Sequence, residues 1–323
     1  RSAARLLFAA RLLQQGHEMG GSGSRQYGPK QISADLWHLG NSESPMMEKT
    51  VPFERLRAHF CRQLTVAEKQ ALVAAVDATR YELWPPPPPG ATSLSIDQLT
   101  DRIRGLVFGS ALGDATGLAT EFLRREDVDA FYGPDFAFCP APAKMKPDTH
   151  RMMWLAGDWT DDTDQLILIL QSLLHTRGVA DEHDFAQRLL TWRERGFAEL
   201  GDESAAGLGA HTKAVLQDPD FITRPTEVAH AHWAAKRGEA SANGGVMRTA
   251  ITGVPNFFDR AAVLATTTAI CRVTHSDPRC VASCVAAAIC VSELLRGTEA
   301  DAYQVVDAAV QAAVSALHME AAA

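Results

Sequence analysis

Hydrophobic and polar positions divide the chain into a weakly patterned N-terminal part and a densely helical remainder. Residues 16–48 are dotted with Gly and Ser and lack a hydrophobic period, which indicates irregular or disordered chain. Amphipathic helices are predicted over 2–15 and 65–81, and the first of these is typical of a surface helix or of an organelle transit peptide. From Ser95 onward, apolar residues recur at helical spacing.

This second part contains a series of predicted helices and almost no alternating, β-branched pattern of the kind that strands show. The first helix begins at a capping box formed by Ser95 and Gln98. Further helices are expected over 163–177, 185–197, 205–216, 226–235, 260–273, 277–295 and 301–317. Because the helix over 163–177 is apolar on nearly all sides, we expect it at the centre of the fold. We therefore predict an all-α protein.

Five consecutive prolines at 85–89, followed by Gly90, separate the two parts. A proline run cannot continue a helix and adopts the stiff polyproline II conformation. The segment is typical of an interdomain linker, with a ligand for a proline-binding partner as the alternative. We accordingly predict an N-terminal extension of unknown role over 1–94, with its linker at 85–90, and a helical domain over 95–323.

Composition narrows the class of protein. The 323 residues are 46% hydrophobic and 22% charged, with a net charge of −8, which argues against nonspecific nucleic-acid binding and for a cytoplasmic protein. The six cysteines form no CxxC pair, so we expect them to be reduced and structural. The most apolar segment, 280–291, is shorter than the roughly 20 residues of a membrane span, so we expect an interior helix and no membrane partner.

Acidic side chains are densest just before the predicted central helix. Four aspartates and two threonines lie within 157–165, among them Thr160, Asp161 and Asp162. Neighbouring carboxylates repel one another unless water or a cation neutralises them, and their oxygens are hard ligands suited to Mg²⁺, Mn²⁺ or Ca²⁺. The cluster therefore indicates a metal site at the start of a buried helix. The alternative is a solvated turn whose acids cap that helix, since Asp162 and Gln165 have the spacing of a capping box.

Glycines mark the end of the first predicted helix of this domain. Gly105, Gly109 and Gly113 recur every four residues, a stripe that predicts the close approach of another helix. Asp114 lies between Gly113 and Gly117, which indicates a tight turn near a ligand or simply a helix end. A second acid, Glu121, follows soon after.

Two further segments contain candidate ligand-binding residues. The first is Asn243-Gly244-Gly245-Val246-Met247-Arg248, where backbone N–H groups, a helix N-terminus and one guanidinium are typical of an anion-binding nest. The alternative is an ordinary interhelical loop with a left-handed turn at Asn243 or Gly244. The second segment contains His275, for which both a structural and a catalytic role are open.

The order of these segments carries more information than any one of them. Gly109-x-x-x-Gly113-Asp114-Ala-x-Gly117 with Glu121-Phe122 is followed by Trp159-Thr160-Asp161-Asp162-Thr163, then by Asn243-Gly244-Gly245-x-Met247-Arg248, and then by Thr274-His275. This series resembles the ADP-ribosylglycohydrolase family over roughly residues 96–295. The resemblance implies an orthogonal multi-helix bundle with two Mg²⁺ or Mn²⁺ ions, which hydrolyses the N- or O-glycosidic bond between ADP-ribose and a protein side chain or small-molecule acceptor.

The resemblance also implies roles for individual residues. Thr160, Asp161 and Asp162 match the first half of the metal-binding set, and Glu121 and Asp161 are the candidate catalytic acids. The candidate substrate-binding residues are Asp114, Asn243, Gly244, Gly245, Met247 and His275, with the Asn243–Met247 loop matching the segment that surrounds the diphosphate and distal ribose. Hydrolysis at an anomeric carbon passes through an oxocarbenium-like state that nearby carboxylates stabilise, so the chemistry suits these residue types.

The sequence departs from the family pattern at one point. The family completes its metal site with a Gly-Asp-x-Asp-Thr type motif near the C-terminus, and no such motif follows His275. We therefore expect the chain to be an incomplete form of the domain. The alternative function is that of a catalytically inactive relative that binds ADP-ribose or is structural. A phosphatase motif at Asp162-Thr163-Asp164 lacks its preceding strand, and an EF-hand counted from Asp158 lacks the required Gly and Glu.

Overall fold

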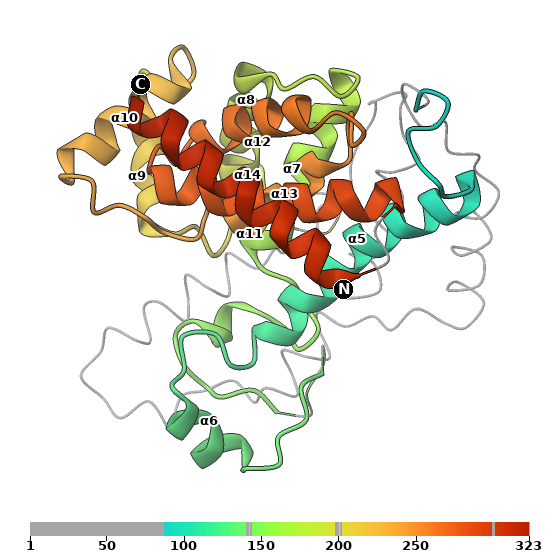
Figure 1. The fold of residues 1–323 in the computed structure, drawn as a ribbon. Coiled ribbons are helices and arrows are strands. Elements are labelled where there is room, and N and C mark those ends of the chain that lie inside the picture. Colours follow the sequence, from blue (N-terminus) through green and yellow to red (C-terminus); the bar gives the residue numbers. More distant parts are fainter. Residues whose placement is uncertain are drawn as a thin grey trace, which may run out of the picture. The chain divides into compact units, whose positions relative to one another are not determined.

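The computed structural model of the protein describes residues 87–139, 142, 144–197, 200, 202–298 and 301–322. Those residues form helices and loops and no strand, which confirms the prediction of an all-α fold (Figure 1). The helices expected over 2–15 and 65–81, the irregular segment 16–48 and the first two prolines of the linker lie outside the described residues.

The observed helices follow the hydrophobic period closely. They are α5 (Ile96–Gly117), α6 (Arg125–Tyr132), α7 (Asp161–His175), α8 (Glu182–Arg195), α9 (Ala210–Gln217), α10 (Pro225–Ala235), α11 (Val246–Thr249), α12 (Arg260–Arg272), α13 (Pro278–Arg296) and α14 (Ala302–Ala322), with 3₁₀ turns η1 (Arg151–Met153) and η3 (Ala250–Gly253). The helix expected from residue 205 begins only at Ala210, because glycines at 207 and 209 interrupt the chain. Helix α6 was not predicted; it is eight residues long and buries none of its residues.

Several helices begin at side-chain caps that satisfy backbone N–H groups. The capping box at the start of α5 is confirmed. The Gln98 backbone N donates to Ser95 Oγ at 3.2 Å, and the Ser95 backbone N donates to Gln98 Oε1 at 2.9 Å. Asp277 accepts from the Arg279 backbone N at 2.8 Å and starts α13, with Pro278 in the first helical position.

The described residues belong to two compact units. The first unit contains residues from 110–160 and 192–207, and the second contains residues from 87–109, 161–191 and 208–322. The core of the first unit consists of aromatic and small apolar side chains, namely Ala111, Ala115, Leu118, Trp154, Trp159 and Trp192.

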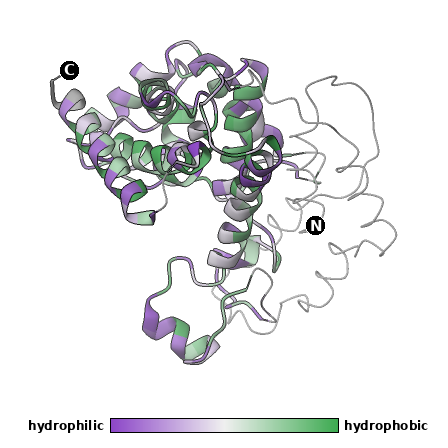
Figure 2. Ribbon diagram, turned by 45° about the vertical axis from the view of Figure 1, so that its right-hand side comes forward, coloured by the Kyte–Doolittle hydropathy of each residue, from purple (hydrophilic) through white to green (hydrophobic). Residues whose placement is uncertain are grey.

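The second unit is built around α13. This helix packs against α12 and α14 and has Val281, Val285 and Ile289 fully buried (Figure 1). Green, apolar colour predominates on the helices at the centre of this unit, and purple is frequent on its outer helices and loops (Figure 2). By length and composition, α13 is the one described helix that could cross a membrane, but 56% of its most apolar window is buried inside the protein.

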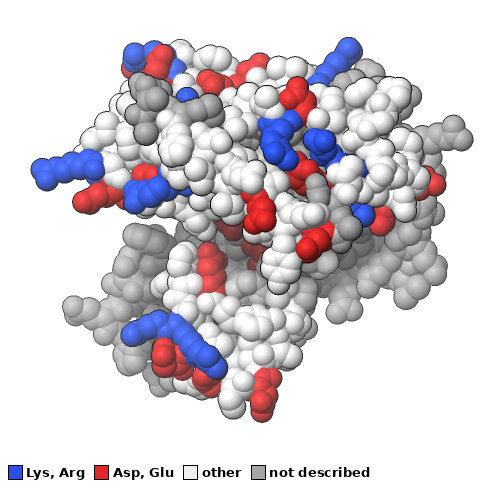
Figure 3. Space-filling model, viewed as in Figure 1, with Lys and Arg blue, Asp and Glu red and all other residues white. Residues whose placement is uncertain are grey.

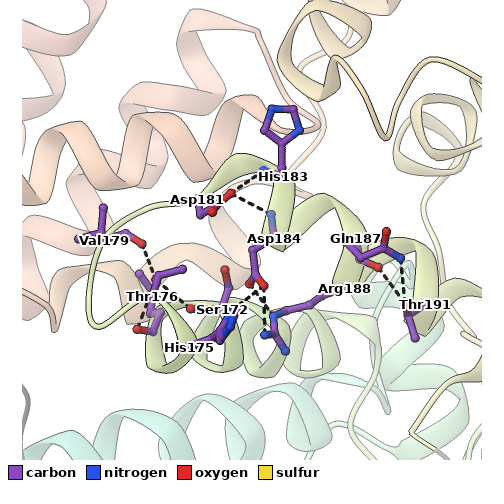
Figure 4. Close-up of polar contacts among 11 residues, drawn as sticks. Ser172, His175, Thr176, Val179, Asp181, His183, Asp184, Gln187, Arg188 and Thr191 are labelled. Carbon is purple, nitrogen blue, oxygen red and sulfur yellow. Dashed lines mark hydrogen bonds and ion pairs between the residues drawn. The ribbon is translucent and has the colours of Figure 1, made fainter.

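Helix α7 is the predicted central helix, and Leu166 to Leu170 are all buried. It ends before Gly178, which has a φ of +85°. A polar cluster joins its last turn to the first turn of α8 (Figure 4). Asp184 Oδ1 lies 2.9 Å from His175 Nδ1, and Arg188 Nε donates to Asp184 Oδ2 at 2.7 Å. Asp181 caps α8 by accepting from the backbone N of Asp184 at 2.9 Å.

The glycine stripe of α5 does not serve the role predicted for it. A Cβ placed at Gly105, Gly109 or Gly113 would meet no atom of the described residues within 4 Å. The expectation of a closely packed partner helix was therefore wrong within the described chain. The stripe lies on the exposed side of α5, whereas Leu99, Ile103 and neighbouring apolar residues face the core.

The surface of the protein has charges of both signs, as its composition indicates. On the face shown in Figure 3, acidic and basic side chains of the described residues are interspersed rather than gathered by sign.

The five cysteines within the described residues are free thiols, as expected, and Cys61 lies outside them. Cys271 and Cys284 are buried with their sulfur atoms 3.4 Å apart, so they pack as small apolar side chains rather than as a disulfide.

Candidate functional site

In the first unit, Asp114 and Thr160 are brought together although 46 residues separate them. Asp114 Oδ2 accepts from the Thr160 backbone N, and Oδ1 accepts from the Thr160 hydroxyl, both at 2.9 Å. An acid in the last turn of α5 is unfavourable toward the helix dipole, so these two donors offset an electrostatic cost. Asp114 therefore fixes the position of Thr160. Its predicted contact with a substrate stays a prediction.

Glu121, the predicted catalytic acid of the first unit, lies in the loop that follows α5. Its Oε2 is 2.7 Å from His150 Nε2, and the Phe122 ring packs edge-on against the same imidazole at 5.0 Å between centroids. Phe122 has a φ of +58°, an uncommon backbone conformation for an aromatic residue. The buried Arg151 holds this turn, because its guanidinium donates to the Ala119 carbonyl at 2.9 Å and also to the Glu121 carbonyl.

In the second unit, Asp161 and Asp162 occupy the first turn of α7. Carboxylates at a helix N-terminus are stabilised by the helix dipole. Asp161 is 8% exposed, and its Oδ2 accepts from Gln165 Nε2 at 2.8 Å. The side chain of Gln165 therefore hydrogen-bonds to Asp161. The spacing in the sequence had suggested Asp162 as its partner in a capping box.

The oxygens of Thr160, Asp161 and Asp162 are the type of donor that Mg²⁺ or Mn²⁺ prefers. Their number is too small, since such ions take six or so oxygen ligands, several of which are usually waters. Within the described ranges, no three His, Cys, Asp or Glu side chains gather closely enough to hold a metal ion. These residues thus fit a divalent ion in chemistry but do not by themselves form a metal site.

A continuous series of buried hydrogen bonds runs from Asp161 to His275. Gln165 Oε1 accepts from Arg248 Nη1 at 2.6 Å, and Arg248 Nη2 donates to Thr274 Oγ1 at 2.6 Å. Thr274 Oγ1 is in turn 2.8 Å from His275 Nδ1. Gln165, Arg248, Thr274 and His275 are each 0% exposed, so this series is shielded from water throughout its length.

The predicted anion-binding loop packs directly against this series. A Cβ at Gly244 would lie 2.8 Å from His275 Cε1 and 2.9 Å from Nε2, and one at Gly245 would lie 3.1 Å from Cys284 Sγ. A side chain at 244 would therefore clash with His275, and one at 245 would be tightly packed. The left-handed turn expected at Asn243 or Gly244 was wrong, since neither has a positive φ. The guanidinium of Arg248 does not face an anion in the loop, because it is buried against Gln165 and Thr274.

A pocket of about 870 Å³ opens beside the loop. It is lined by His211 and by a segment that runs up to the residue before Asn243, including Lys236, Arg237 and Ser241. His211 Nε2 lies 2.9 Å from the Thr274 carbonyl oxygen, and its ring is 5.0 Å from that of His275. His211 is 6% exposed and its Nδ1 has no hydrogen-bond partner within the described chain.

Burial keeps both imidazoles neutral. It lowers the pKa of His275 well below its usual value, and the charge of Arg248 lowers that pKa further. Burial also lowers the pKa of His211. His275 Nε2 is buried and has no hydrogen-bond partner among the described residues. A neutral imidazole in this position can donate one hydrogen bond or accept one, according to which nitrogen has the proton.

Comparison with known protein families identifies the family of this chain. The family model described as ADP-ribosylglycohydrolase matches residues 95–322, a range that includes all four motifs. The chain belongs to the ADP-ribosylglycohydrolase family. This confirms the resemblance, and the matched range begins where the helical domain was predicted to begin.

Several relatives are detectable at low identity. The chain is similar to the ADP-ribosyl-[dinitrogen reductase] glycohydrolase of Rhodospirillum rubrum, with 24% identity over 61% of this chain and 59% of that protein. It is similar to the ADP-ribosylarginine hydrolase Tri1 of Pseudomonas putida, with 31% identity over 33% of this chain and 25% of that one. An Archaeoglobus fulgidus protein is 27% identical over 60% of this chain and 56% of its own length. No solved structure matches the chain. The chain spans at most about 59% of the length of these relatives.

The structure thus places the predicted residues in two groups. Asp114, Thr160 and Glu121 belong to the first unit, and Asp161, Asp162 and the residues of the 243–247 loop with His275 belong to the second. Sequence reasoning did not single out His150 and His211, and it named Gln165 and Thr274 without predicting their contacts with Arg248. For Gln165 a signal existed, because a polar residue one turn after Asp161 precedes a purely apolar run and so has to find a buried partner.

Proposed function

We propose that the full-length protein is an ADP-ribosylglycohydrolase, which hydrolyses the glycosidic bond between ADP-ribose and a side chain of a modified protein or a small-molecule acceptor. The observation that carries this proposal is the family match over 95–322, which includes every candidate site residue. Two of the relatives are named as hydrolases of ADP-ribosylated arginine or of ADP-ribosylated dinitrogen reductase. These names support an ADP-ribosylated protein as the partner.

The second unit supplies the features of a site for the ADP-ribose group. The Asn243–Met247 segment presents a glycine-rich backbone that leads into α11. It lies beside a pocket lined by two cationic side chains, Lys236 and Arg237, and by one carboxylate, Glu239. Backbone N–H groups and cations suit a diphosphate. The buried His275 ring packs against Gly244 and has an unpartnered ring nitrogen, which suits a polar atom of a ligand.

In the first unit, the Glu121 carboxylate is the candidate acid or base, with His150 as its hydrogen-bond partner. A carboxyl group hydrogen-bonded to an imidazole can exchange a proton with it, and general acid–base catalysis requires such a group. Thr160, Asp161 and Asp162 provide part of the oxygen ligands for Mg²⁺ or Mn²⁺, and the remaining ligands come from outside this set. When bound, such an ion orients hydroxyl groups and polarises water. The free thiols and acidic surface support a cytoplasmic location.

A test is release of ADP-ribose from mono-ADP-ribosylated arginine and serine peptides by the full-length protein, with and without Mg²⁺ or Mn²⁺. We expect metal-dependent release from one of the two peptides. The variant Glu121→Gln should lower the rate by about 10²-fold or more, whereas Glu126→Gln, an exposed acid on α6, should leave it unchanged. Absence of release from both peptides at any metal concentration would exclude hydrolysis of ADP-ribosylated arginine and serine.

A second function is favoured by one observation, the small number of oxygen ligands that the described residues gather at the start of α7. A relative that binds ADP-ribose without cleaving it needs the loop and the pocket but no complete metal site. Calorimetric titration with free ADP-ribose distinguishes the two functions. Binding together with absent release identifies the binding protein, and binding together with release identifies the enzyme.

A further inference from the structure

Arg248 is the most unusual charged residue of the second unit. It is fully buried, and its guanidinium forms hydrogen bonds with an amide and a hydroxyl group rather than with a carboxylate. Burying a guanidinium without a directly paired anion is costly, since arginine remains charged at any ordinary pH. Asp161 contributes a favourable charge interaction from beyond Gln165, and the Phe185 ring lies 5.0 Å from the guanidinium. Such a residue needs an explanation beyond packing.

The hydrogen bonds on both sides of Arg248 have a single consistent direction. A guanidinium only donates and a carboxylate only accepts. The Gln165 amide between them is therefore forced to place its oxygen toward Arg248 and its nitrogen toward Asp161, as observed. Arg248 likewise fixes the Thr274 hydroxyl oxygen as an acceptor, so the hydroxyl hydrogen is available for another partner.

That partner is His275 Nδ1, 2.8 Å away. If the imidazole proton were on Nδ1, Thr274 Oγ1 would accept twice and its own buried hydrogen would lack the acceptor it now has. Leaving a buried donor without an acceptor is strongly unfavourable. The hydroxyl therefore donates to Nδ1, and the proton of the neutral imidazole is on Nε2.

The Nε2–H group is directed toward the glycine loop. A Cβ at Gly244 would lie 2.9 Å from Nε2, and the nitrogen is buried without a partner in the described chain. The other nearby imidazole does not supply a partner: His211 Nε2 donates to the Thr274 carbonyl, and His211 Nδ1, which could accept, has no hydrogen-bond partner among the described residues. The Nε2–H group of His275 is thus free to donate to an acceptor atom that the described residues do not provide.

We propose that Arg248 and Thr274 are positioning residues, which keep the proton of neutral His275 on Nε2 so that this nitrogen donates a hydrogen bond to an oxygen atom of the ligand at the Asn243–Met247 loop. The identity of that ligand as ADP-ribose rests on the proposed function above. The direction of the hydrogen bonds does not, and it can be measured without any ligand.

The first measurement is the protonation state of each ring nitrogen of His275, from long-range ¹H–¹⁵N NMR spectra of the unliganded full-length protein. The signals are assigned by their loss in His275→Gln. We expect a protonated Nε2 and an unprotonated Nδ1 in the wild type and in Thr274→Ser, which keeps the hydroxyl. In Thr274→Val we expect a mixture of both tautomers. A wild-type His275 with its proton on Nδ1 would overturn the inference whatever the variants do.

The second measurement is calorimetric affinity for ADP-ribose, with Thr252→Val as a matched control. Thr252 is also a fully buried threonine of the second unit, and its hydroxyl hydrogen-bonds to Thr267 and to the Thr249 carbonyl at 2.7 Å, outside the series. We expect Thr274→Val to weaken binding about three- to tenfold, Thr274→Ser to restore it, and Thr252→Val to leave it unchanged.

Equal weakening in Thr252→Val and Thr274→Val would reduce Thr274 to a structural role and overturn the inference, as would an unchanged tautomer in Thr274→Val. If the wild type binds no ADP-ribose, the proposed function fails, while the NMR spectra still decide whether Thr274 positions the His275 proton.

Discussion

The contact between Gly244 and His275 leads to a prediction whose size can be worked out from the structure. In Gly244→Ala the new methyl group would lie 2.8 Å from His275 Cε1, well inside van der Waals contact. Because Gly244 does not have a positive φ, alanine fits the backbone there and the effect is one of packing alone.

The imidazole has little freedom to move away. His275 is 0% exposed, its Nδ1 is hydrogen-bonded to Thr274, and its ring contacts that of His211. Overpacking of a well-filled core costs about 1–3 kcal/mol. At about 2–4 °C per kcal/mol for a domain of this size, the melting temperature should fall by about 2–12 °C.

Differential scanning calorimetry of the variant measures this fall, and Gly105→Ala provides the matched control. Gly105 lies inside α5 with no atom of the described residues within 4 Å of its Cβ position, so alanine there should raise stability by about 0.5–1 kcal/mol. Opposite signs for the two Gly→Ala changes are the expected result. A Gly244→Ala variant that melts at or above the wild-type temperature would refute the close packing of the loop on His275.

Three other predictions concern protonation, the first unit and the metal. Burial lowers the pKa of both His211 and His275, so below about pH 6.5 the unfolded state binds more protons than the folded state. The free energy of unfolding should therefore decrease as the pH is lowered below that value, by up to about 1.4 kcal/mol per pH unit for each imidazole. Urea unfolding of wild type and His275→Gln between pH 7.5 and about 5 tests this, and equal slopes would contradict it. Asp114→Ala removes both hydrogen bonds to Thr160 and should cost about 1–3 kcal/mol in urea unfolding, with a smaller loss in Asp114→Asn; no loss would show that Asp114 does not hold Thr160. Asp161→Ala and Asp162→Ala should each abolish Mn²⁺ binding by the full-length protein in calorimetry, and unchanged affinity would count against both as ligands.

Much of the fold could be predicted from the sequence because it depends on local patterns. The apolar run after Asp164 identified α7 as the central helix, and the Ser95–Gln98 pair located the start of α5. Caps and hydrophobic periods act over a few residues, so a single sequence displays them directly. Helix α6 was missed because it is only eight residues long, which is shorter than the stretch over which a helical period can be recognised.

The sequence by itself also determined the family, because four short motifs in a set order are specific even when each is common, and the match over 95–322 agrees with them. Only the tertiary structure decided what several motif residues contact. The same letters, Asn-Gly-Gly-x-Met-Arg, suggested a guanidinium facing an anion, but Arg248 points inward to Gln165 and Thr274, which lie 83 and 26 residues away. The direction of a long side chain depends on the partners that packing brings to it, and those partners are distant in sequence. For the same physical reason the sequence suggested an anion-binding loop or a left-handed turn at Asn243 or Gly244, and it did not reveal that the glycines at 244 and 245 lie close to His275 and Cys284.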